Sequence, residues 1–223
     1  MSRLLKALGG FGILGLVLAL VPGAAHAATI TFNFNVCGSS TNTGVGNADC
    51  GTTSTYTSGG YTIVATAFPS VAGGGNDLWA KNGGAGSDEN GLGLTSDGSG
   101  EDEITPGHFI QLTLSPSIVG NDPLTLTMGS TTGTEAWRVV ETNTAGSMVG
   151  ATFEMSGSSE GTPGFTISPT DTYLDITETT EGGNILLSSL SFTTATTPEP
   201  SSLVLLGSGI LSPAGAVRRK LKA

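Results

Sequence analysis

Basic side chains are scarce in this sequence and unevenly placed. There are 8 Lys and Arg residues against 18 Asp and Glu. Six of the 8 lie in the first 27 or the last 26 residues, whereas Glu199 is the one acidic residue there. Residues 28–197 therefore hold 2 basic and 17 acidic side chains, a net charge of −15. So acidic a surface repels phosphate backbones, which excludes nucleic acid as a partner.

Long apolar runs are absent except at the two ends of the chain. At the N-terminal end, Arg3 and Lys6 precede an apolar stretch, 8–21, and Ala25-His26-Ala27 supplies a small-residue cleavage site. This is the pattern of a secretory signal with a helical apolar part. We therefore expect residues 1–27 to engage the secretion translocon and to be removed by signal peptidase. The alternatives are an N-terminal membrane anchor and a buried helix.

The C-terminal end carries a second apolar stretch, 203–217, between two motifs. Pro198-Glu199-Pro200 precedes it and Arg218-Arg219-Lys220 follows it. As a helix, 15 residues rise about 22 Å, which is short of the roughly 30 Å hydrocarbon core. Pro213 further disfavours a stable span, because proline inside a helix costs about 3 kcal/mol. We expect a transient membrane association with the basic cluster on the cytoplasmic side; an ordinary single-pass anchor is the alternative.

A Thr-rich linker (193–197), the Pro-Glu-Pro triplet, the apolar segment and the basic end together resemble the PEP-CTERM protein-sorting signal. The resemblance implies that residues 198–223 form a sorting tail recognised by exosortase, a membrane protease that cleaves near the triplet. The protein would then be released to the cell surface or into exopolysaccharide. The runs 78–82, 89–94, 103–104, 109–112, 128–133 and 186–190, together with Trp137, are also similar to a recurring ectodomain of such proteins. This similarity spans most of residues 77–192 and implies a shared β domain, with no catalytic residues to carry over.

Helical periodicity is absent between the two ends. Short runs with period-two alternation recur instead, separated by Gly-, Asn- and Pro-rich turns. The runs are 29–36, 61–68, 109–114, 124–128, 136–141, 151–155, 173–177 and 185–192. They predict an all-β fold over residues 28–192, an antiparallel sandwich arranged as a jelly roll, flanked by the signal helix and the C-terminal hydrophobic helix.

Cysteine is nearly absent, and both cysteines lie in the exported segment. Export places Cys37 and Cys50 in an oxidising compartment, where we expect them to form a disulfide. The alternatives are two unpaired thiols or a metal pair, although zinc requires four such donors.

One Gly-rich stretch, 71–107, has only brief strand signals, at 77–80 and 92–94, so we expect it to be mostly ordered loop with a functional or metal-stabilised role. It contains seven carboxylates: Asp77, Asp88, Glu89, Asp97, Glu101, Asp102 and Glu103. Calcium takes six to eight oxygen ligands in a tolerant geometry, so these residues form a candidate calcium site. A solvated acidic surface without metal is the alternative.

Histidine is too scarce for a serine hydrolase. Gly157–Gly161 fits the G-x-S-x-G pattern, but His108 lies upstream of it and no helical pattern follows. We therefore expect no enzymatic activity. The sequence favours an exported structural or interaction protein of the cell surface or the exopolysaccharide-associated extracellular matrix. The alternative is a calcium-dependent, lectin-like carbohydrate-binding module that uses Trp79 and Asn76.

Overall fold

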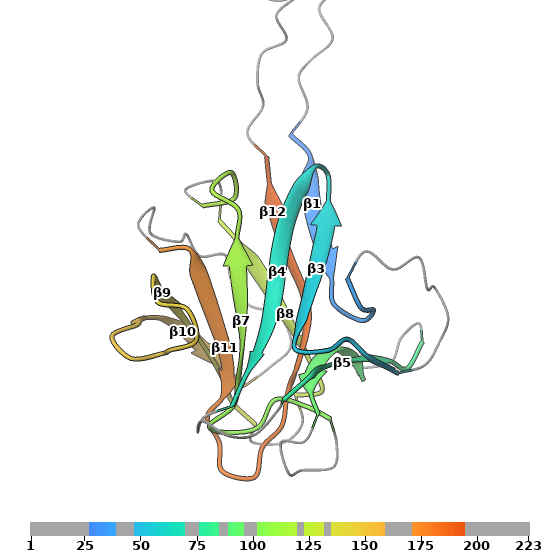
Figure 1. Ribbon diagram of the computed structural model, residues 1–223, viewed down its shortest axis with the longest axis vertical. Coiled ribbons are helices and arrows are strands. Elements are labelled where there is room, and N and C mark those ends of the chain that lie inside the picture. Colours follow the sequence, from blue (N-terminus) through green and yellow to red (C-terminus); the bar gives the residue numbers. More distant parts are fainter. Residues whose placement is uncertain are drawn as a thin grey trace, which may run out of the picture. The chain divides into compact units, whose positions relative to one another are not determined.

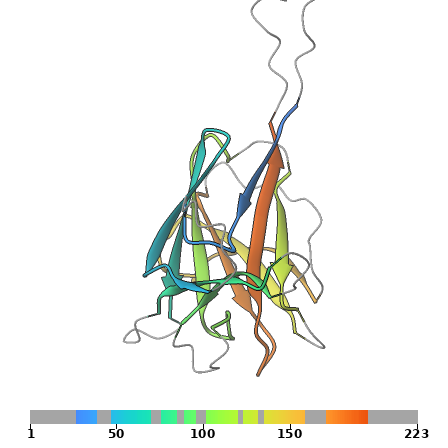
Figure 2. The same ribbon diagram turned by 90° about the vertical axis from the view of Figure 1, so that its right-hand side faces the viewer.

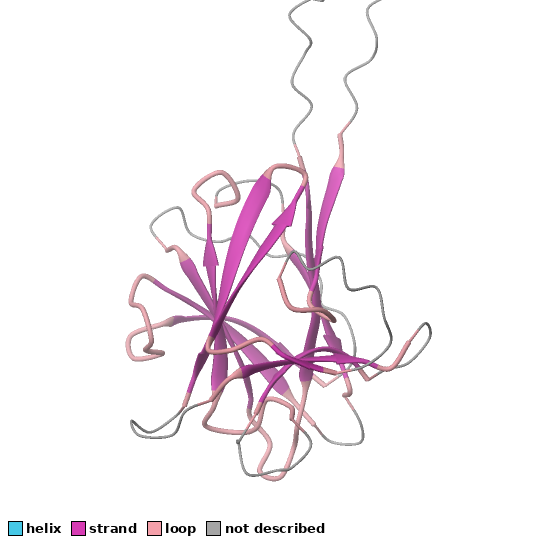
Figure 3. Ribbon diagram, turned by 45° about the vertical axis from the view of Figure 1, so that its right-hand side comes forward, coloured by secondary structure: helices cyan, strands magenta, loops and turns pink. Residues whose placement is uncertain are grey.

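The regular structure of this protein consists of β-strands. The computed structural model describes residues 27–38, 47–69, 76–84, 89–95, 102–119, 123–131, 135–158 and 171–194. Over these ranges there are twelve strands and no helix (Figure 3). The all-β prediction is confirmed. The helices expected over the two terminal apolar segments fall outside the described residues.

Six strands form the first sheet, and all of its pairings are antiparallel. Its path is β1 (Thr29–Asn33), β12 (Leu186–Thr193), β6 (Asn90–Leu94), β5 (Leu78–Asn82) and β2 (Ala48–Asp49), with β8 (Thr125–Gly129) also paired to β12. β8 follows one edge of β12 from Leu186 to Ser191. The other edge is shared, because β1 pairs with its later half and β6 pairs with it at Leu187.

Six more strands form the second antiparallel sheet (Figure 1). Their order is β10 (Thr152–Gly157), β9 (Trp137–Thr142), β11 (Tyr173–Glu178), β7 (Phe109–Leu114), β4 (Tyr61–Phe68) and β3 (Thr53–Ser58). A register shift between Phe153 and Met155 interrupts the β9–β10 pairing.

The two sheets share one hydrophobic core, which confirms a sandwich-like arrangement (Figure 2). The core takes buried side chains from the first sheet, such as Leu92 and Leu190, and from the second, such as Ile63 and Leu112. Aromatic contacts also join the sheets: the Tyr61 ring of β4 meets the Phe192 ring of β12 edge-on, with centroids 5.0 Å apart. The jelly-roll connectivity stays a prediction.

The strand predictions differ in accuracy along the chain. The runs 61–68 and 109–114 coincide with β4 and β7, and six others fall within three residues of the observed strand ends. β2 and β3 were not predicted. The stretch expected to be mostly loop contains two paired strands, β5 and β6.

Candidate functional site

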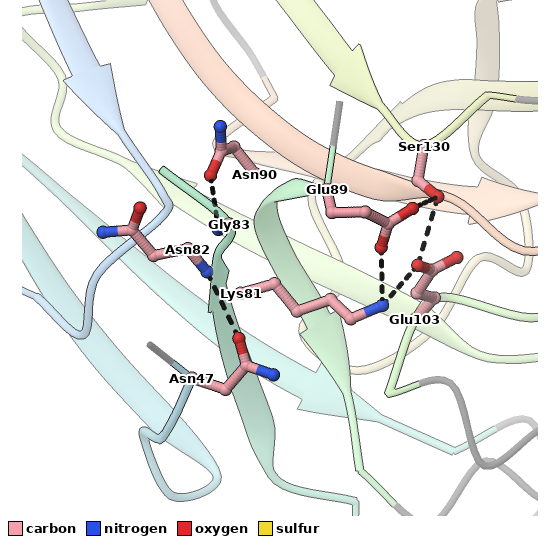
Figure 4. A network of polar contacts seen from close by, with 8 residues as sticks. All are labelled: Asn47, Lys81, Asn82, Gly83, Glu89, Asn90, Glu103 and Ser130. Atoms are coloured by element: carbon pink, nitrogen blue, oxygen red, sulfur yellow. Dashed lines mark hydrogen bonds and ion pairs between the residues drawn. The ribbon is translucent and has the colours of Figure 1, made fainter. Parts of the chain in front are cut away.

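A buried ionic cluster lies beside the first sheet, where β5 and β6 meet two distant segments (Figure 4). Lys81 of β5 is its centre. The Lys81 Nζ lies 2.9 Å from Glu89 Oε2 and 2.5 Å from Glu103 Oε1. The side chain of Glu103 is 3% exposed and that of Lys81 is 12% exposed, whereas that of Glu89 is 46% exposed. The cluster is therefore closed on the Glu103 side and open to solvent on the Glu89 side.

Two glycines of β6 allow this arrangement. A Cβ built on Gly93 would lie 2.0 Å from the Asp102 carbonyl oxygen, and one on Gly91 would lie 2.7 Å from the Leu187 carbonyl oxygen. The 102–104 segment can therefore cross β6 at backbone contact, after which Ile104 forms a bridge with Ile185 next to β12. Because Gly93 has no side chain, the 102–104 segment can approach β6 closely enough for the Glu103 carboxyl group to reach Lys81.

Ser130, directly after β8, links the two carboxyl groups. Its Oγ lies 2.8 Å from Glu89 Oε1 and 3.1 Å from Glu103 Oε1. A hydroxyl has one proton, so it can donate to only one of these acceptors at a time. When Ser130 donates its proton to Glu89, a hydrogen bond between Ser130 and Glu103 requires that the Glu103 carboxyl group be protonated. Ser130 also has φ 54°, an uncommon conformation for a residue with a side chain.

The pKa values of the cluster follow from this geometry. Burial raises the pKa of Glu103 to about 7, even though Lys81 acts in the opposite direction. Burial would also raise the pKa of Glu89, but hydrogen bonds from Lys81 and Ser130 outweigh it, and the pKa of Glu89 is lowered. For Lys81, burial acts to lower the pKa, but contacts with Glu103 and Glu89 outweigh it and the pKa is raised. The cluster therefore holds a lysinium, the Glu89 carboxylate and a Glu103 carboxyl that changes its protonation near neutral pH.

Asn184 extends the cluster to the turn between β11 and β12. We orient the Asn184 amide so that its nitrogen faces the two acidic side chains, because only this orientation gives both contacts a donor. The nitrogen then donates to Glu135 Oε1 at 2.7 Å and to Glu103 Oε2 at 3.1 Å. Both oxygens of the Glu103 carboxyl therefore have partners. Ser130, Glu135 and Asn184 were not predicted as members of the site, because they lie far from Lys81 in the sequence.

The predicted calcium ligands are only partly brought together. Glu89 and Glu103 meet at Lys81. The backbone of Asp77 pairs with Thr95, and Asp102 lies over Gly93. Asp88, Asp97 and Glu101 fall outside the described residues. Within the described ranges, no group of three or more His, Cys, Asp or Glu side chains could hold a metal. The calcium site stays a prediction.

A pocket of about 600 Å³ adjoins the cluster at the end of the sandwich formed by the β11–β12 turn. This turn is the lowest loop in Figure 1, drawn in orange. The lining includes Thr105, Pro106, Thr179, Glu181, Gly183 and Asn184. Asn184 belongs to both features, so the buried carboxyl groups lie directly behind the pocket wall.

The predicted ligand-binding pair, Trp79 and Asn76, is more buried than a surface platform requires. Asn76 is 4% exposed, and its amide nitrogen has no hydrogen-bond partner among the described residues. Trp79 is half-buried on β5, and its Nε1 likewise has no partner there. Their role in carbohydrate binding stays a prediction.

The predicted disulfide between Cys37 and Cys50 is confirmed. The bond joins the chain after β1 to the chain after β2, with the two Cα atoms 5.1 Å apart. The two cysteines are separated by 13 positions in the sequence. A structural disulfide is typical of proteins that fold in an oxidising compartment.

A second buried polar pair lies on the outer face of the second sheet. Gln111 of β7 donates from Nε2 to Asp175 Oδ1 on β11 at 2.8 Å. The turn between β9 and β10 covers them, because Gln111 also donates to the Thr144 carbonyl and accepts from the Gly146 N–H. Asp175 is fully buried and its Oδ2 has no partner among the described residues. Burial raises the pKa of Asp175 to about 7.

Comparison with known proteins identifies the C-terminal end. A family model described as the PEP-CTERM protein-sorting motif matches residues 196–220. The chain therefore carries a PEP-CTERM sorting tail, which confirms the resemblance of this segment. The motif is that of an exported protein that is held at the membrane during sorting and processed by exosortase. No curated protein and no solved structure matches the chain. No helix within the described ranges is long and apolar enough to cross a bilayer.

Proposed function

We propose that this protein is a non-enzymatic structural or interaction protein of the cell surface or the exopolysaccharide-associated matrix, released by exosortase. The observation that carries the proposal is the sorting motif at residues 196–220. The Cys37–Cys50 disulfide supports the same route, because disulfides persist outside the reducing cytosol. The translocon and signal peptidase would act first, and exosortase would remove the tail.

The ionic cluster supports a structural role for its carboxyl groups. A catalytic carboxyl must come within hydrogen-bond reach of a substrate proton. Glu103 is 3% exposed, and its two oxygens already contact Lys81, Ser130 and Asn184. Calcium forms no part of the proposal, since Lys81 already supplies the counter-charge at Glu89 and Glu103.

The route is tested by expressing the full chain in a bacterium that has exosortase. We expect extracellular material whose C-terminus, read by intact mass, lacks Arg218-Arg219-Lys220. Replacing Pro198-Glu199-Pro200 by three alanines should leave the chain in the membrane fraction with its basic end intact. As a matched control, Ser201→Ala and Ser202→Ala together should leave release unchanged. A released wild-type chain that retains the basic end would contradict the proposal.

The destination is tested by fractionating the same cultures. The proposal predicts that the released protein sediments with cell-surface or exopolysaccharide material and dissociates when the polysaccharide is digested or stripped. Free protein in the medium under all conditions would contradict the matrix assignment and leave the processing route unaffected.

A further inference from the structure

The pocket beside Asn184 carries an inference about ligand chemistry. We propose that this pocket, walled by the β11–β12 turn and the Thr105–Pro106 segment, binds a saccharide that bears free amino groups. The site differs from the Trp79–Asn76 position and requires no calcium. The proposal rests on the pocket alone and not on the route of export.

The size of the pocket suits a small ligand. Its volume of about 600 Å³ falls within the roughly 300–1,000 Å³ typical of small-molecule sites. The Pro106 ring gives one apolar wall, and the exposed Gly182 presents backbone rather than a side chain. A sugar ring presents both an apolar C–H face and polar edges, so it matches a wall of this mixed kind.

Several hydrogen-bond donors of the lining are already used within the protein. The Thr179 hydroxyl donates its one proton to the Ala136 carbonyl, with an Oγ1–O distance of 2.9 Å. The amide nitrogen of Asn184 donates to Glu103 and Glu135. The Gly183 N–H donates to the Thr180 carbonyl at 2.9 Å. With these three donors in use, a ligand that brings donors of its own, as hydroxyl and ammonium groups do, suits the pocket.

Among the described residues, carboxyl groups outnumber cations around the pocket. The carboxylate of Glu181 lies in the lining, and Glu103 and Glu135 lie behind Asn184. A Cβ on Gly183 would lie 2.8 Å from Glu178 Oε1, so a fourth carboxyl group adjoins the turn from behind. Glu178 is 2% exposed, and its Oε2 has no hydrogen-bond partner among the described residues. Two cations lie near these groups among the described residues: Lys81 contacts Glu103, and Arg138 pairs in register with Thr177, next to Glu178.

This excess of carboxyl groups selects among donor-rich ligands. It repels uronates and phosphates, and it favours a ligand that carries positive charge. A lysine side chain from a protein partner would supply one ammonium group and fill a small part of the volume. An amino sugar supplies an ammonium group, several hydroxyl donors and a ring, so it uses the acceptors, the charge and the apolar wall together.

The test is calorimetric titration of the full chain in mild detergent with a glucosamine tetramer. Two ligands of the same length serve as controls: the N-acetylglucosamine tetramer, whose nitrogens are uncharged, and a galacturonate tetramer, which is anionic. We expect the glucosamine tetramer to bind at least tenfold more tightly than the acetylated one, and the galacturonate tetramer not to bind.

The exposed Glu181 provides variants that keep the fold. Glu181→Gln should weaken binding of the glucosamine tetramer two- to fivefold, and Glu181→Lys should weaken it at least tenfold. Asp171→Asn is the matched control, because this partly buried carboxyl precedes the opposite end of β11 and should leave binding unchanged. Amide NMR shifts on binding should centre on Gly182, Gly183 and Asn184. The proposal is overturned by an absence of binding at millimolar ligand, by equal binding of the acetylated tetramer, or by binding that Glu181→Lys leaves intact.

Discussion

The buried carboxyl of Asp175 makes the stability of the second sheet depend on pH in a direction opposite to that of most acidic residues. It is fully buried, with one hydrogen bond from Gln111 and one oxygen without a partner among the described residues. Its pKa in the folded protein is about 7, raised from 3.8 by burial. The folded state therefore holds a proton that the unfolded state releases between about pH 4 and pH 7. Since stability falls with pH wherever the folded state binds more protons, this group destabilises the protein as the pH rises through that window.

The size of the effect follows from the shift. A change from 3.8 to about 7 is roughly 3 pKa units, which at 1.36 kcal/mol per unit corresponds to about 4 kcal/mol. This is a ceiling, because relaxation and water penetration reduce the penalty of real buried charges. Asp175→Asn keeps the shape and the acceptor for Gln111 but cannot ionise. Its stability should match that of the wild type near pH 4 and exceed it by up to about 4 kcal/mol at pH 8.

The assay is urea unfolding of the full chain, followed by the fluorescence of the buried Trp137 at pH 4.5, 6 and 8. Glu103 also has a pKa of about 7, so the wild-type slope contains both groups, and Glu103→Gln should remove a separate part of it. Asp171→Asn makes the same charge change before the same strand, and we expect it to leave the slope unchanged. Parallel curves for wild type and Asp175→Asn across the three pH values would refute the reasoning.

Three further perturbations test the cluster and the framework. Lys81→Met should destabilise the protein by about 3–5 kcal/mol, more at pH 8 than at pH 5, because it leaves two carboxyl groups without their cation; pH-dependent urea unfolding measures this, and a uniform loss would count against the cluster. Gly93→Ala should cost about 2 kcal/mol or more, since its Cβ would lie 2.0 Å from the Asp102 carbonyl; a melting temperature within one degree of wild type would contradict the close approach. Cys37→Ala with Cys50→Ala should lower stability by about 3 kcal/mol, with reductant destabilising the wild type and leaving the double variant unchanged.

The sequence predicted those strands that have one apolar face toward the core. β4 alternates Ile63, Ala65 and Ala67 inward with more exposed residues between them, and its bounds were predicted to the residue. β3 was missed because Tyr56 is its one large apolar residue among Ser and Thr. Its strand character comes from pairing with β4 along its whole length, which no local pattern records.

The glycines of β6 show a second limit of local sequence. Gly91 and Gly93 suggest loop, because glycine weakens a strand and has no side chain to contribute to packing. They belong to a strand because another segment crosses it at backbone contact, and that crossing places Glu103. Lys81 is the one basic residue in the stretch 71–107. Ser130 and Asn184, which contact Glu103, come from distant segments that only the fold brings near. In the same way, Gln111 lies on the face of β7 opposite the core residues Ile110 and Leu112, and only the β9–β10 turn buries it.

Because basic residues are scarce, the position of Lys81 bears directly on where calcium could bind. Residues 28–197 contain two cations, Lys81 and Arg138, and one of them lies between two carboxyl groups. A calcium ion at the same oxygens would stand next to the lysinium, and two such like charges about 4 Å apart repel by several kcal/mol at the dielectric of a protein surface. Calcium and Lys81 are therefore alternative counter-ions for Glu89 and Glu103. A calcium site in the acidic stretch would have to be built on the other five carboxyl groups, without the two that Lys81 already pairs; these five are Asp77, Asp88, Asp97, Glu101 and Asp102.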